Sequence, residues 1–264
     1  MLKAEDILGC VEGYILVIDE NGKTIFSNNN YADELYKKNG VKVSNNIICF
    51  QEKCYSVQTK DIIKEGKKYL YICYHDITTI FEYEQSLLKQ AMTDSLTRIC
   101  NRHGIEKVIE NFRTSLDSSC VVYADIDHFK KVNDTYSHEA GDFILREIAK
   151  IIGDNIRKDD LVGRMGGEEF LIVLNSTNIE NAKPKLESIK EKIKKHNFNW
   201  NDNQIKLTVS FGVSEFDPSR GIDFESTIEE ADKALYHSKE NGRDQITYFN
   251  EMKLGMKDSV KTRK

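Results

Sequence analysis

The stretch Cys120-Val121-Val122-Tyr123-Ala124-Asp125-Ile126-Asp127 decides the fold of the larger part of the chain. Its nearly unbroken apolar run is typical of a central strand that is buried on both faces of a sheet. Further strand-like runs lie at 161–165, 168–174 and 205–213, and amphipathic helix patterns alternate with them. The run at 205–213 alternates strictly, which predicts a strand with one buried face. Residues 94–250 are therefore expected to form a mixed sheet with helices packed on it.

Residues 1–80 predict a smaller unit built on an antiparallel sheet. An apolar strand at 11–19 leads into Asn21-Gly22, a typical hairpin turn, and a second strand returns from it. A helix-prone stretch from Tyr31 to Lys38 and two or three strands between residues 47 and 77 complete the unit. The whole chain is therefore expected to have an α/β (α+β) fold.

Residues 78–92 contain neither Gly nor Pro and predict a helix between the two units. Ile80, Tyr83 and Leu87 follow a/d spacing and fall on one face of that helix, although Gln90 would be a poor seam residue. Two interpretations remain open. The stripe either packs on its own domain, as short stripes usually do, or forms a coiled coil with a second helix.

Length and composition exclude several classes of protein. The chain has 264 residues, 39% hydrophobic and 31% charged, with a net charge of −5, so neither a disordered nor a membrane-embedded protein is expected. The acidic balance argues against a protein that coats nucleic-acid phosphates. Apolar runs such as Phe170–Leu174 are too short to cross a membrane, and residues 1–6 lack a signal-peptide pattern. We therefore expect a cytoplasmic protein of two modest domains, with no membrane or nucleic-acid partner.

The cysteines carry no clear metal-binding pattern. The chain has six cysteines: Cys10, Cys49, Cys54, Cys73, Cys100 and Cys120. Most of them are expected to be reduced, partly buried thiols. Cys49 and Cys54, followed by Cys73 and His75, match no standard zinc spacing. Apolar packing is the favoured interpretation, and a metal site is the alternative.

Acidic residues follow two of the predicted strands. Asp125 and Asp127 lie on one face at the end of the central strand, where ligands bind in open α/β sheets. Gly166-Gly167-Glu168-Glu169 forms a predicted hairpin turn, which a ligand can approach closely. If the two strands are neighbours, Asp125 and Glu168 converge and could hold Mg2+. Taken singly, each would be interpreted as a solvated loop acid.

Two cations end the last predicted helix. Lys239 and Arg243 stand one turn apart, a spacing that could hold the terminal phosphates of a nucleotide. The alternative is the positive charge that commonly stabilises a helix C-terminus.

These motifs, in this order, resemble the GGDEF family of diguanylate cyclases. Gly166-Gly167-Glu168-Glu169-Phe170 matches the family hallmark. Other motifs that match in order are Asp94-Ser95-Leu96-Thr97, Asn101-Arg102, Asp125-Ile126-Asp127-His128-Phe129-Lys130, Asn133-Asp134, His138, Gly141-Asp142, Arg164, Ser210-Phe211-Gly212, Ala231-Asp232-Lys233-Ala234-Leu235-Tyr236 and Gly242-Arg243. The resemblance covers about 94–250 and implies a central mixed five-stranded sheet flanked by helices.

The resemblance implies a role for each matching residue. Asp125, Glu168 and the Ile126 carbonyl would bind Mg2+, with Mn2+ as an alternative. Glu168 would also accept a proton, Glu169 would be required, and Lys130 would stabilise charge on the phosphates. The residues that would bind GTP are Asn133, Asp142, Phe129, His138, Lys239 and Arg243. Among them, Asn133 and Asp142 would recognise guanine, and Lys239 and Arg243 would hold the β/γ phosphates.

The implied reaction is attack of one GTP's 3′-hydroxyl on the α-phosphate of another, twice, giving c-di-GMP and pyrophosphate. Because each domain would hold one GTP, the active species would be a homodimer. Arg157 and Asp160 match the family's product-inhibition motif at the expected offset before Gly166. The chain departs from the family at Ser137, where members usually have Gly.

Residues 1–80 resemble a PAS sensor domain, which typically ends in a motif such as Asp76-Ile77-Thr78. The implied organisation is a PAS-like sensor at 1–80, a signalling helix at 81–93, a cyclase domain at 94–250 and a basic tail at 251–264 that is expected to be disordered. No residue in the first half identifies the ligand or signal.

Two alternative functions remain. A catalytically inactive member could act as a receptor for GTP or c-di-GMP, but such proteins usually lack the hallmark acids that are present here. A cyclase with relaxed base choice could make mixed cyclic dinucleotides, although Asp142 favours guanine.

Overall fold

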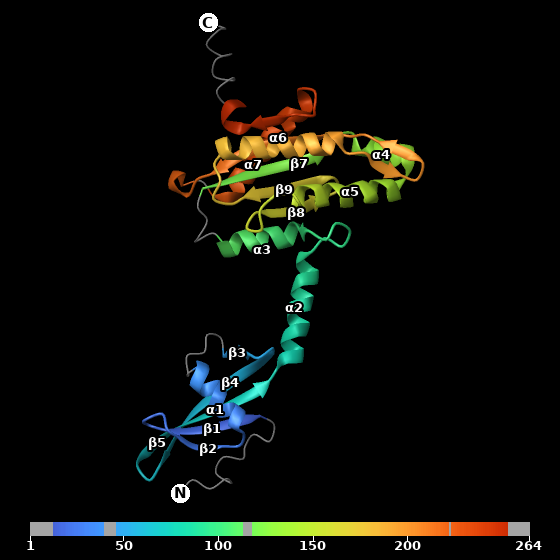
Figure 1. The fold of residues 1–264 in the computed structure, drawn as a ribbon. Coiled ribbons are helices and arrows are strands. Elements are labelled where there is room, and N and C mark those ends of the chain that lie inside the picture. Colours follow the sequence, from blue (N-terminus) through green and yellow to red (C-terminus); the bar gives the residue numbers. More distant parts are fainter. Residues whose placement is uncertain (1–12, 40–45, 113–117, 222, 253–264) are drawn as a thin grey trace. The chain divides into compact units, whose positions relative to one another are not determined.

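The computed structural model describes residues 13–39, 46–112, 118–221 and 223–252. The chain divides into two compact units, Met1–Leu88 and Lys89–Lys264 (Figure 1). The division falls inside the helix that was predicted to connect the domains. Cys10 and residues 253–264 of the predicted tail lie outside the described residues. No helix in the described ranges is long and apolar enough to cross a membrane.

The first unit is an antiparallel sheet with one helix beside it. Its strand order is β2-β1-β5-β4-β3. The elements are β1 (Tyr14–Asp19), β2 (Thr24–Ser27), α1 (Asn30–Asn39), β3 (Ile47–Phe50), β4 (Lys53–Lys64) and β5 (Lys67–Asp76). Leu16 and Ile72 of the sheet pack against Ala32 and Leu35 of α1, and this apolar cluster holds the helix in place. The turn at Gly22 has a positive φ of 78°, as predicted for Asn-Gly.

The prediction for two of the cysteines was wrong. Cys49 and Cys54 face each other across the β3–β4 hairpin and are joined by a disulfide. The two-residue turn brings directly opposed side chains within bonding distance, and sequence spacing does not reveal that pairing. Because a disulfide leaves no thiolate to bind a metal, Cys49 and Cys54 are not available as ligands for the alternative metal site. Cys73, Cys100 and Cys120 are free.

Helix α2 (Thr78–Met92) buries none of its side chains. Its first turn is fixed by Asp76, whose Oδ1 accepts hydrogen bonds from the Thr78 backbone N (3.0 Å) and Oγ1 (2.5 Å). Ile80, Tyr83 and Leu87 are 62%, 65% and 45% exposed. The apolar stripe therefore packs on none of the described residues of its own domain, which favours the coiled-coil interpretation over the other.

The second unit has the predicted mixed sheet. Its strand order is β13-β12-β7-β9-β8-β6. The strands are β6 (Cys100–Asn101), β7 (Ser119–Ile126), β8 (Leu161–Gly166), β9 (Glu169–Leu174), β12 (Val209–Phe216) and β13 (Ile246–Tyr248), with a separate hairpin of β10 (Phe198–Trp200) and β11 (Asn203–Ile205). The sheet has six strands rather than five, because the two-residue strand β6 pairs with β8 in parallel.

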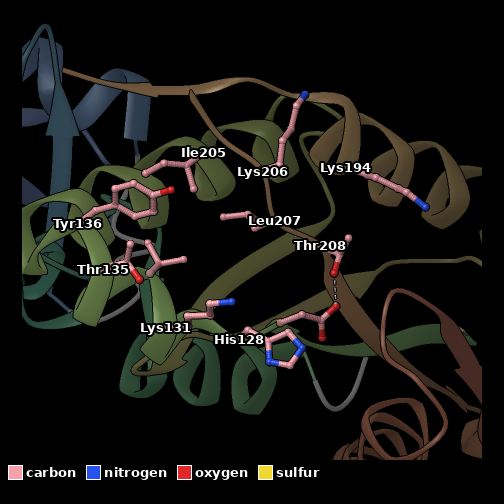
Figure 2. Close-up of a pocket in the computed structure, with 11 residues that line it drawn as sticks. His128, Lys131, Thr135, Tyr136, Lys194, Ile205, Lys206, Leu207 and Thr208 are labelled. Atoms are coloured by element: carbon pink, nitrogen blue, oxygen red, sulfur yellow. Dashed lines mark hydrogen bonds between the residues drawn. The ribbon is translucent and has the colours of Figure 1, made fainter. Parts of the chain in front are cut away.

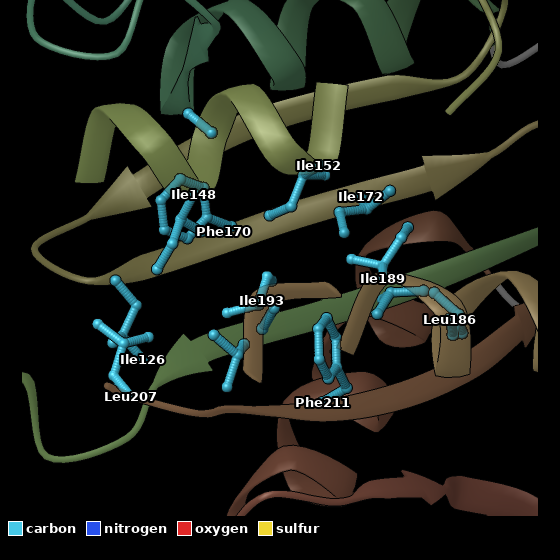
Figure 3. Close-up of a cluster of buried hydrophobic side chains, with 14 of the residues drawn as sticks. Ile126, Ile148, Ile152, Phe170, Ile172, Leu186, Ile189, Ile193, Leu207 and Phe211 are labelled. Atoms are coloured by element: carbon cyan, nitrogen blue, oxygen red, sulfur yellow. The ribbon is translucent and has the colours of Figure 1, made fainter. Parts of the chain in front are cut away.

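Helices cover both faces of this sheet. They are α3 (Arg102–Phe112), α4 (Phe129–Tyr136), α5 (His138–Gly153), α6 (Ile179–Lys195) and α7 (Phe224–Glu240), with a 3-10 turn at Pro218–Arg220. The larger core lies under α4, α5 and α6, where Ile148 and Ile189 meet Phe170 and Phe211 of the sheet (Figure 3). The smaller core lies under α3 and α7. Every residue of β7 is buried, as its sequence predicted.

The run predicted as one strand from 205 to 213 is divided. Ile205 ends β11, and a new strand, β12, begins at Val209. β12 is buried on both faces rather than on one. Small residues make this possible: a Cβ at Gly212 would lie 2.0 Å from the backbone N of Leu235, so α7 approaches the strand closely there. Within β12 the alternation therefore marked a change in side-chain size. Before β12 it did mark a change from core to solvent, because Lys206 is exposed between the buried residues Ile205 and Leu207.

Ser137 joins α4 to α5 in a backbone conformation that favours glycine. Its φ is 143° and its ψ is 169°, a region used almost only by glycine. Its side chain caps α5 by accepting a hydrogen bond from the Ala140 backbone N at 3.3 Å. The residue thus combines a useful cap with a strained backbone.

We predict that Ser137→Gly stabilises the protein by about 1 kcal/mol. Relief of the backbone strain stabilises the folded state by about 1–3 kcal/mol. Replacing the Ser cap by Gly costs only a few tenths of a kcal/mol, and the larger entropy loss of Gly on folding costs about 0.5–1 kcal/mol. Ser137→Ala is the matched control, because it keeps the strain and loses the cap, and we expect it to destabilise by about 1 kcal/mol. Thermal unfolding of the two variants measures both. A lower Tm for the Gly variant would contradict the assignment of strain.

Candidate active site

Acidic residues from two neighbouring strands meet at one end of the sheet. Asp125 lies near the end of β7, opposite Glu169, the first residue of β9. Glu168 lies in the turn between β8 and β9, and its carbonyl oxygen accepts a hydrogen bond from the Ile126 backbone N at 3.4 Å. Asp125, Ile126 and Glu168, which were predicted to act together, are therefore brought together.

Burial raises the pKa of both carboxyl groups. Burial is the main cause that raises the pKa of Asp125 above its ordinary value, although a hydrogen bond from Lys239 and its charge act to lower it. Burial also raises the pKa of Glu168, followed by the negative charge of Asp125, and Lys239 again opposes the shift. The negative charge of Asp125 therefore disfavours ionisation of Glu168, and the positive charge of Lys239 favours it.

Lys239 of α7 supplies positive charge at this point. Its Nζ lies 2.7 Å from Asp125 Oδ2, and the Asp125 side chain is only 7% exposed. Among the described residues no group of three or more His, Cys, Asp and Glu side chains is arranged to hold a metal ion. The two carboxylates and the Ile126 carbonyl are all oxygen groups. Mg2+ prefers oxygen ligands: it binds one or two carboxylates and completes its shell with phosphate oxygens and water.

The turn that carries Glu168 is braced by an ion pair. Arg164 of β8 donates a hydrogen bond from Nε to the Gly167 carbonyl oxygen (2.9 Å), and its Nη1 lies 3.3 Å from Asp94 Oδ1. Asp94 also accepts hydrogen bonds from the Thr97 backbone N (2.8 Å) and Oγ1 (2.6 Å). Burial alone would raise the pKa of Asp94, but the Thr97 hydrogen bonds and Arg164 outweigh it and hold the pKa below its ordinary value. The first matching motif thus positions the hallmark turn.

Asn101 and Arg102 serve the same region. Asn101 Oδ1 accepts a hydrogen bond from the Gly104 backbone N (2.8 Å) at the start of α3, and its Nδ2 donates to the Ala91 carbonyl oxygen (2.8 Å). Arg102 Nε donates to the carbonyl oxygen of Met165 at 3.1 Å, just before the Gly-Gly turn. From the sequence, these two residues were known only as part of a motif. Their partners are backbone atoms, and that of Arg102 is 63 residues away in the chain.

The residues predicted to recognise guanine lie between α4 and α5. Asn133 faces Gly141, where an added Cβ would lie 1.9 Å from its Oδ1, so the glycine lets the two helices approach. Asp142 follows on α5 and is exposed. Phe129, which was predicted to bind substrate, is only 6% exposed and belongs to the core. Its ring packs near Gly141, at the contact between α4 and α5. His138, at the start of α5, is exposed.

The remaining predicted phosphate ligands are exposed. Lys130 lies in the first turn of α4. Arg243 has a positive φ of 63°, and its backbone N donates to the Ser238 carbonyl oxygen at 3.0 Å. The neighbouring backbone N of Asp244 donates to Asp127 Oδ2 at 3.1 Å. The loop of Arg243 is therefore tied to the end of β7.

Asp127 has a structural role that the sequence did not reveal. It is 5% exposed, and its carboxylate accepts hydrogen bonds from Thr208 Oγ1 (2.6 Å) and Ser210 Oγ (2.7 Å) in addition to the one from Asp244. These donors come from different parts of the chain. Asp127 therefore joins the end of β7 to the start of β12 and to the Arg243 loop.

Arg157 and Asp160 form a turn after α5, apart from these residues in sequence. Asp160 is buried and accepts hydrogen bonds from the backbone N atoms of Arg157 (2.8 Å) and Asn175 (3.0 Å) and from Lys185 Nζ (3.3 Å). The Arg157 side chain is exposed. Asp160 shapes the turn, and the Arg157 guanidinium is the group that is accessible to a ligand.

Comparison with known proteins identifies relatives of the second unit. The profile of the family described as diguanylate cyclase, GGDEF domain, matches residues 91–245. Diguanylate cyclase A of Treponema denticola is 37% identical over 171 residues, which are 61% of this chain and 45% of that protein. A diguanylate cyclase of Vibrio cholerae is 35% identical over 184 residues, 67% of this chain and 55% of its own length. The chain thus spans about half the length of these curated relatives.

Solved structures agree with the sequence relatives. The coiled coil and GGDEF domain of DgcB from Caulobacter crescentus, in complex with c-di-GMP, has a TM-score of 0.60 and 29% identity, covering 65% of this chain and 93% of that one. The diguanylate cyclase SiaD of Pseudomonas aeruginosa, in complex with its activator SiaC, has a TM-score of 0.58 and 33% identity, covering 64% of this chain and 66% of that one.

We predict that Glu168→Gln raises Tm at neutral pH in metal-free buffer, by about 1 °C or more. The raised pKa means that the folded state disfavours the ionised carboxylate, so wild-type stability falls as the pH rises through about 4.3 and the raised folded value. Gln carries no charge, so its advantage should shrink toward zero as the pH falls to about 4. Thermal unfolding across this range measures the difference.

Glu106→Gln is the control, because Glu106 is an exposed residue of α3. It should leave Tm unchanged at each pH. A decrease in Tm for Glu168→Gln at neutral pH would mean that the ionised carboxylate stabilises the fold, against the assignment of repulsion with Asp125.

Proposed function

The chain belongs to the GGDEF family of diguanylate cyclase domains, and we propose that it condenses two GTP into c-di-GMP and two pyrophosphates. The observation that carries this proposal is the convergence of Asp125 and Glu168 beside the Ile126 backbone and Lys239. Relatives that lack such acids could bind nucleotide without turnover. In this chain the acids are present and electrostatically coupled, which favours catalysis over a receptor function.

Asp125, Glu168 and the Ile126 carbonyl would hold Mg2+ or Mn2+. When bound, such an ion would neutralise charge on the GTP phosphates. Lys239 and Arg243 are placed at the end of α7 and in the following loop, from which they would bind the β and γ phosphates. Lys130 in the first turn of α4 would add positive charge near the same phosphates. Lys239 would exchange part of its contact with Asp125 for the phosphates.

Guanine would be held by Asn133 and Asp142. A carboxylate accepts hydrogen bonds from the N–H groups of guanine, and an amide both donates and accepts. The close approach of α4 to α5 at Gly141 supports this assignment, because it sets the two side chains at one helix–helix contact. His138 would contact the substrate from the start of α5.

The chemical step would be in-line attack of a 3′-hydroxyl on an α-phosphate. Glu168, the family's proposed proton acceptor, would take the hydroxyl proton, and its raised pKa makes it a better base than an ordinary glutamate. Glu169 lies beside Asp125 in the sheet and adds negative charge to the pair. Most of the rate enhancement would come from positioning and charge stabilisation.

Two such sites must face each other, so the active form would be a homodimer. The exposed stripe of Ile80, Tyr83 and Leu87 on α2 supports a coiled coil with a second copy of this chain, because it is otherwise covered by no part of the described residues. The first unit would be a PAS-like regulator. Its strand order β2-β1-β5-β4-β3 and the Asp76–Thr78 contact at its end support this assignment.

Product would bind at the turn of Arg157 and slow the enzyme. An exposed guanidinium can bind guanine or phosphate through two parallel hydrogen bonds. Asp160 would contribute by fixing the turn, since its carboxylate already accepts three hydrogen bonds.

We predict that the protein converts GTP to c-di-GMP only when Mg2+ or Mn2+ is present. Chromatography of the reaction mixture measures product, and the rate per molecule should rise with protein concentration until the dimer is saturated. Glu168→Gln should abolish turnover, because it removes a metal ligand and the proton acceptor. Tight GTP binding without product by the wild-type dimer would support the receptor function instead. Mixed dinucleotides formed from GTP and ATP together would contradict guanine recognition.

Arg157→Ala should raise the concentration of c-di-GMP at which turnover stalls, by about tenfold or more if two charge-assisted hydrogen bonds are lost. Product accumulation over time measures the plateau. Lys158→Ala, one residue away and also exposed, is the matched control. Equal plateaus for wild type and Arg157→Ala would reduce the motif to a surface turn.

A further inference from the structure

A cavity of about 660 Å³ lies beside α4, on the side away from the candidate guanine residues (Figure 2). Lys131 and Thr135 line it, and at 100° per residue they lie on the face of α4 opposite Asn133. Lys194 of α6 and the segment 205–208 form the other walls. The proposed reaction uses none of these side chains.

The walls combine an apolar surface with a few polar groups. Ile205, Leu207 and Val132 are buried and form the apolar part. Tyr136 is 37% exposed at the rim. In Figure 2 the Tyr136 hydroxyl and the Lys131 ammonium are both directed inward, on the side of Leu207. A few convergent polar groups over an apolar wall are typical of small-molecule sites.

The charge in the cavity is positive. Lys131, Lys194 and Lys206 line it against a single carboxylate, Asp127, whose oxygens already accept three hydrogen bonds. Lys206 Nζ donates to the carbonyl oxygens of Lys195 (3.0 Å) and His196 (3.2 Å), which leaves its charge unbalanced. The Lys131 ammonium has no hydrogen-bond or ion-pair partner within the part of the chain that the structure describes. An anion would give the Lys131 ammonium a partner and balance the charge of Lys206, whereas Lys194 already has a carboxylate partner in Asp244.

We propose that this cavity, the α4 pocket, binds a small phosphate monoester that carries a planar ring, of the class of nucleoside monophosphates. The phosphate would bind Lys131, since a compact ammonium suits a phosphate as a point charge. The ring would pack between Tyr136 and the apolar wall at Leu207. This binding step does not depend on the proposed cyclase activity.

The α4 pocket is joined to the Arg243 loop through Lys194. Lys194 lines the pocket, and its Nζ lies 2.6 Å from Asp244 Oδ2. The other oxygen, Asp244 Oδ1, is buried and has no hydrogen-bond partner among the described residues, so Lys194 is the cation that balances this carboxylate. A bound phosphate would compete for Lys194 and weaken the hold on the loop that presents Arg243. This second step rests on the proposed function.

AMP is a suitable probe for binding, because the predicted guanine residues should not recognise adenine. Trp200 is the single tryptophan of the chain and lies in β10, paired with the strand that ends at Ile205. Its fluorescence, checked by calorimetry, should report saturable AMP binding to the full chain. Lys131→Ala should weaken AMP at least tenfold through the lost charged contact. Lys150→Ala, an exposed lysine of α5, should bind like wild type.

Adenosine, ribose 5-phosphate and inorganic phosphate separate the two parts of the ligand. Each should bind more weakly than AMP if the ring and the phosphate both contribute. Equal affinity of AMP for wild type and Lys131→Ala would overturn the proposal. Adenosine or inorganic phosphate binding as tightly as AMP would overturn the ligand class.

Steady-state kinetics test the coupling. AMP should raise the KM for GTP several-fold with little change in kcat, and Lys131→Ala should abolish this response. Lys194→Ala should raise KM without AMP and make it insensitive to AMP, while still binding AMP. An equal AMP effect in Lys131→Ala would indicate competition at the GTP site and overturn the coupling. A chain that binds AMP but does not turn over GTP would refute the proposed function and leave the α4 pocket intact.

Discussion

The structure of the second unit depends on one constraint: a strand that is buried along its whole length ends in a carboxylate. β7 has no exposed residue, and Asp125 within it is only 5% exposed. A buried carboxylate needs a partner, and Lys239 reaches it from α7 at 2.7 Å. This contact ties α7 to the strand. α7 carries Lys239 and leads into the loop of Arg243, the two cations proposed to bind the phosphates. The same burial raises the pKa of Asp125.

Much of the polar chemistry around this strand holds backbone in place. Arg164, which is paired with Asp94, donates a hydrogen bond to the Gly-Gly turn, and Arg102 donates one to Met165, the residue before the turn. Asp127 joins three segments through its hydrogen bonds. The contacts of Arg164 and Arg102 hold the hallmark turn in place through residues from distant parts of the domain. Glu168 lies in a turn with two glycines, and such a turn would be mobile without side chains that bind its carbonyl groups.

The first unit and the α4 pocket raise the question of control. In the first unit, Asp76 and Thr78 fix the start of α2, whereas the last turn of α2 is held in the second unit through Ala91 and Asn101. In the second unit, Lys194 and Asp244 connect a positively charged cavity to the Arg243 loop. A signal could therefore reach the nucleotide site from the helix or from the cavity. Both proposed routes would act through the position of a few side chains.

The sequence by itself determined the fold class, the central strand, the α2 helix and the set of acids and cations at the site. These follow from local properties: continuous apolar runs, helical spacing and the ordered motifs. It did not determine that Cys49 and Cys54 are bonded, that β12 is buried on both faces, or that Asp127 and Asp160 are structural. Each of these depends on a partner far away in the chain or across a turn. Only tertiary packing decides whether a polar side chain faces a ligand or a backbone N–H, because the same residue type serves both.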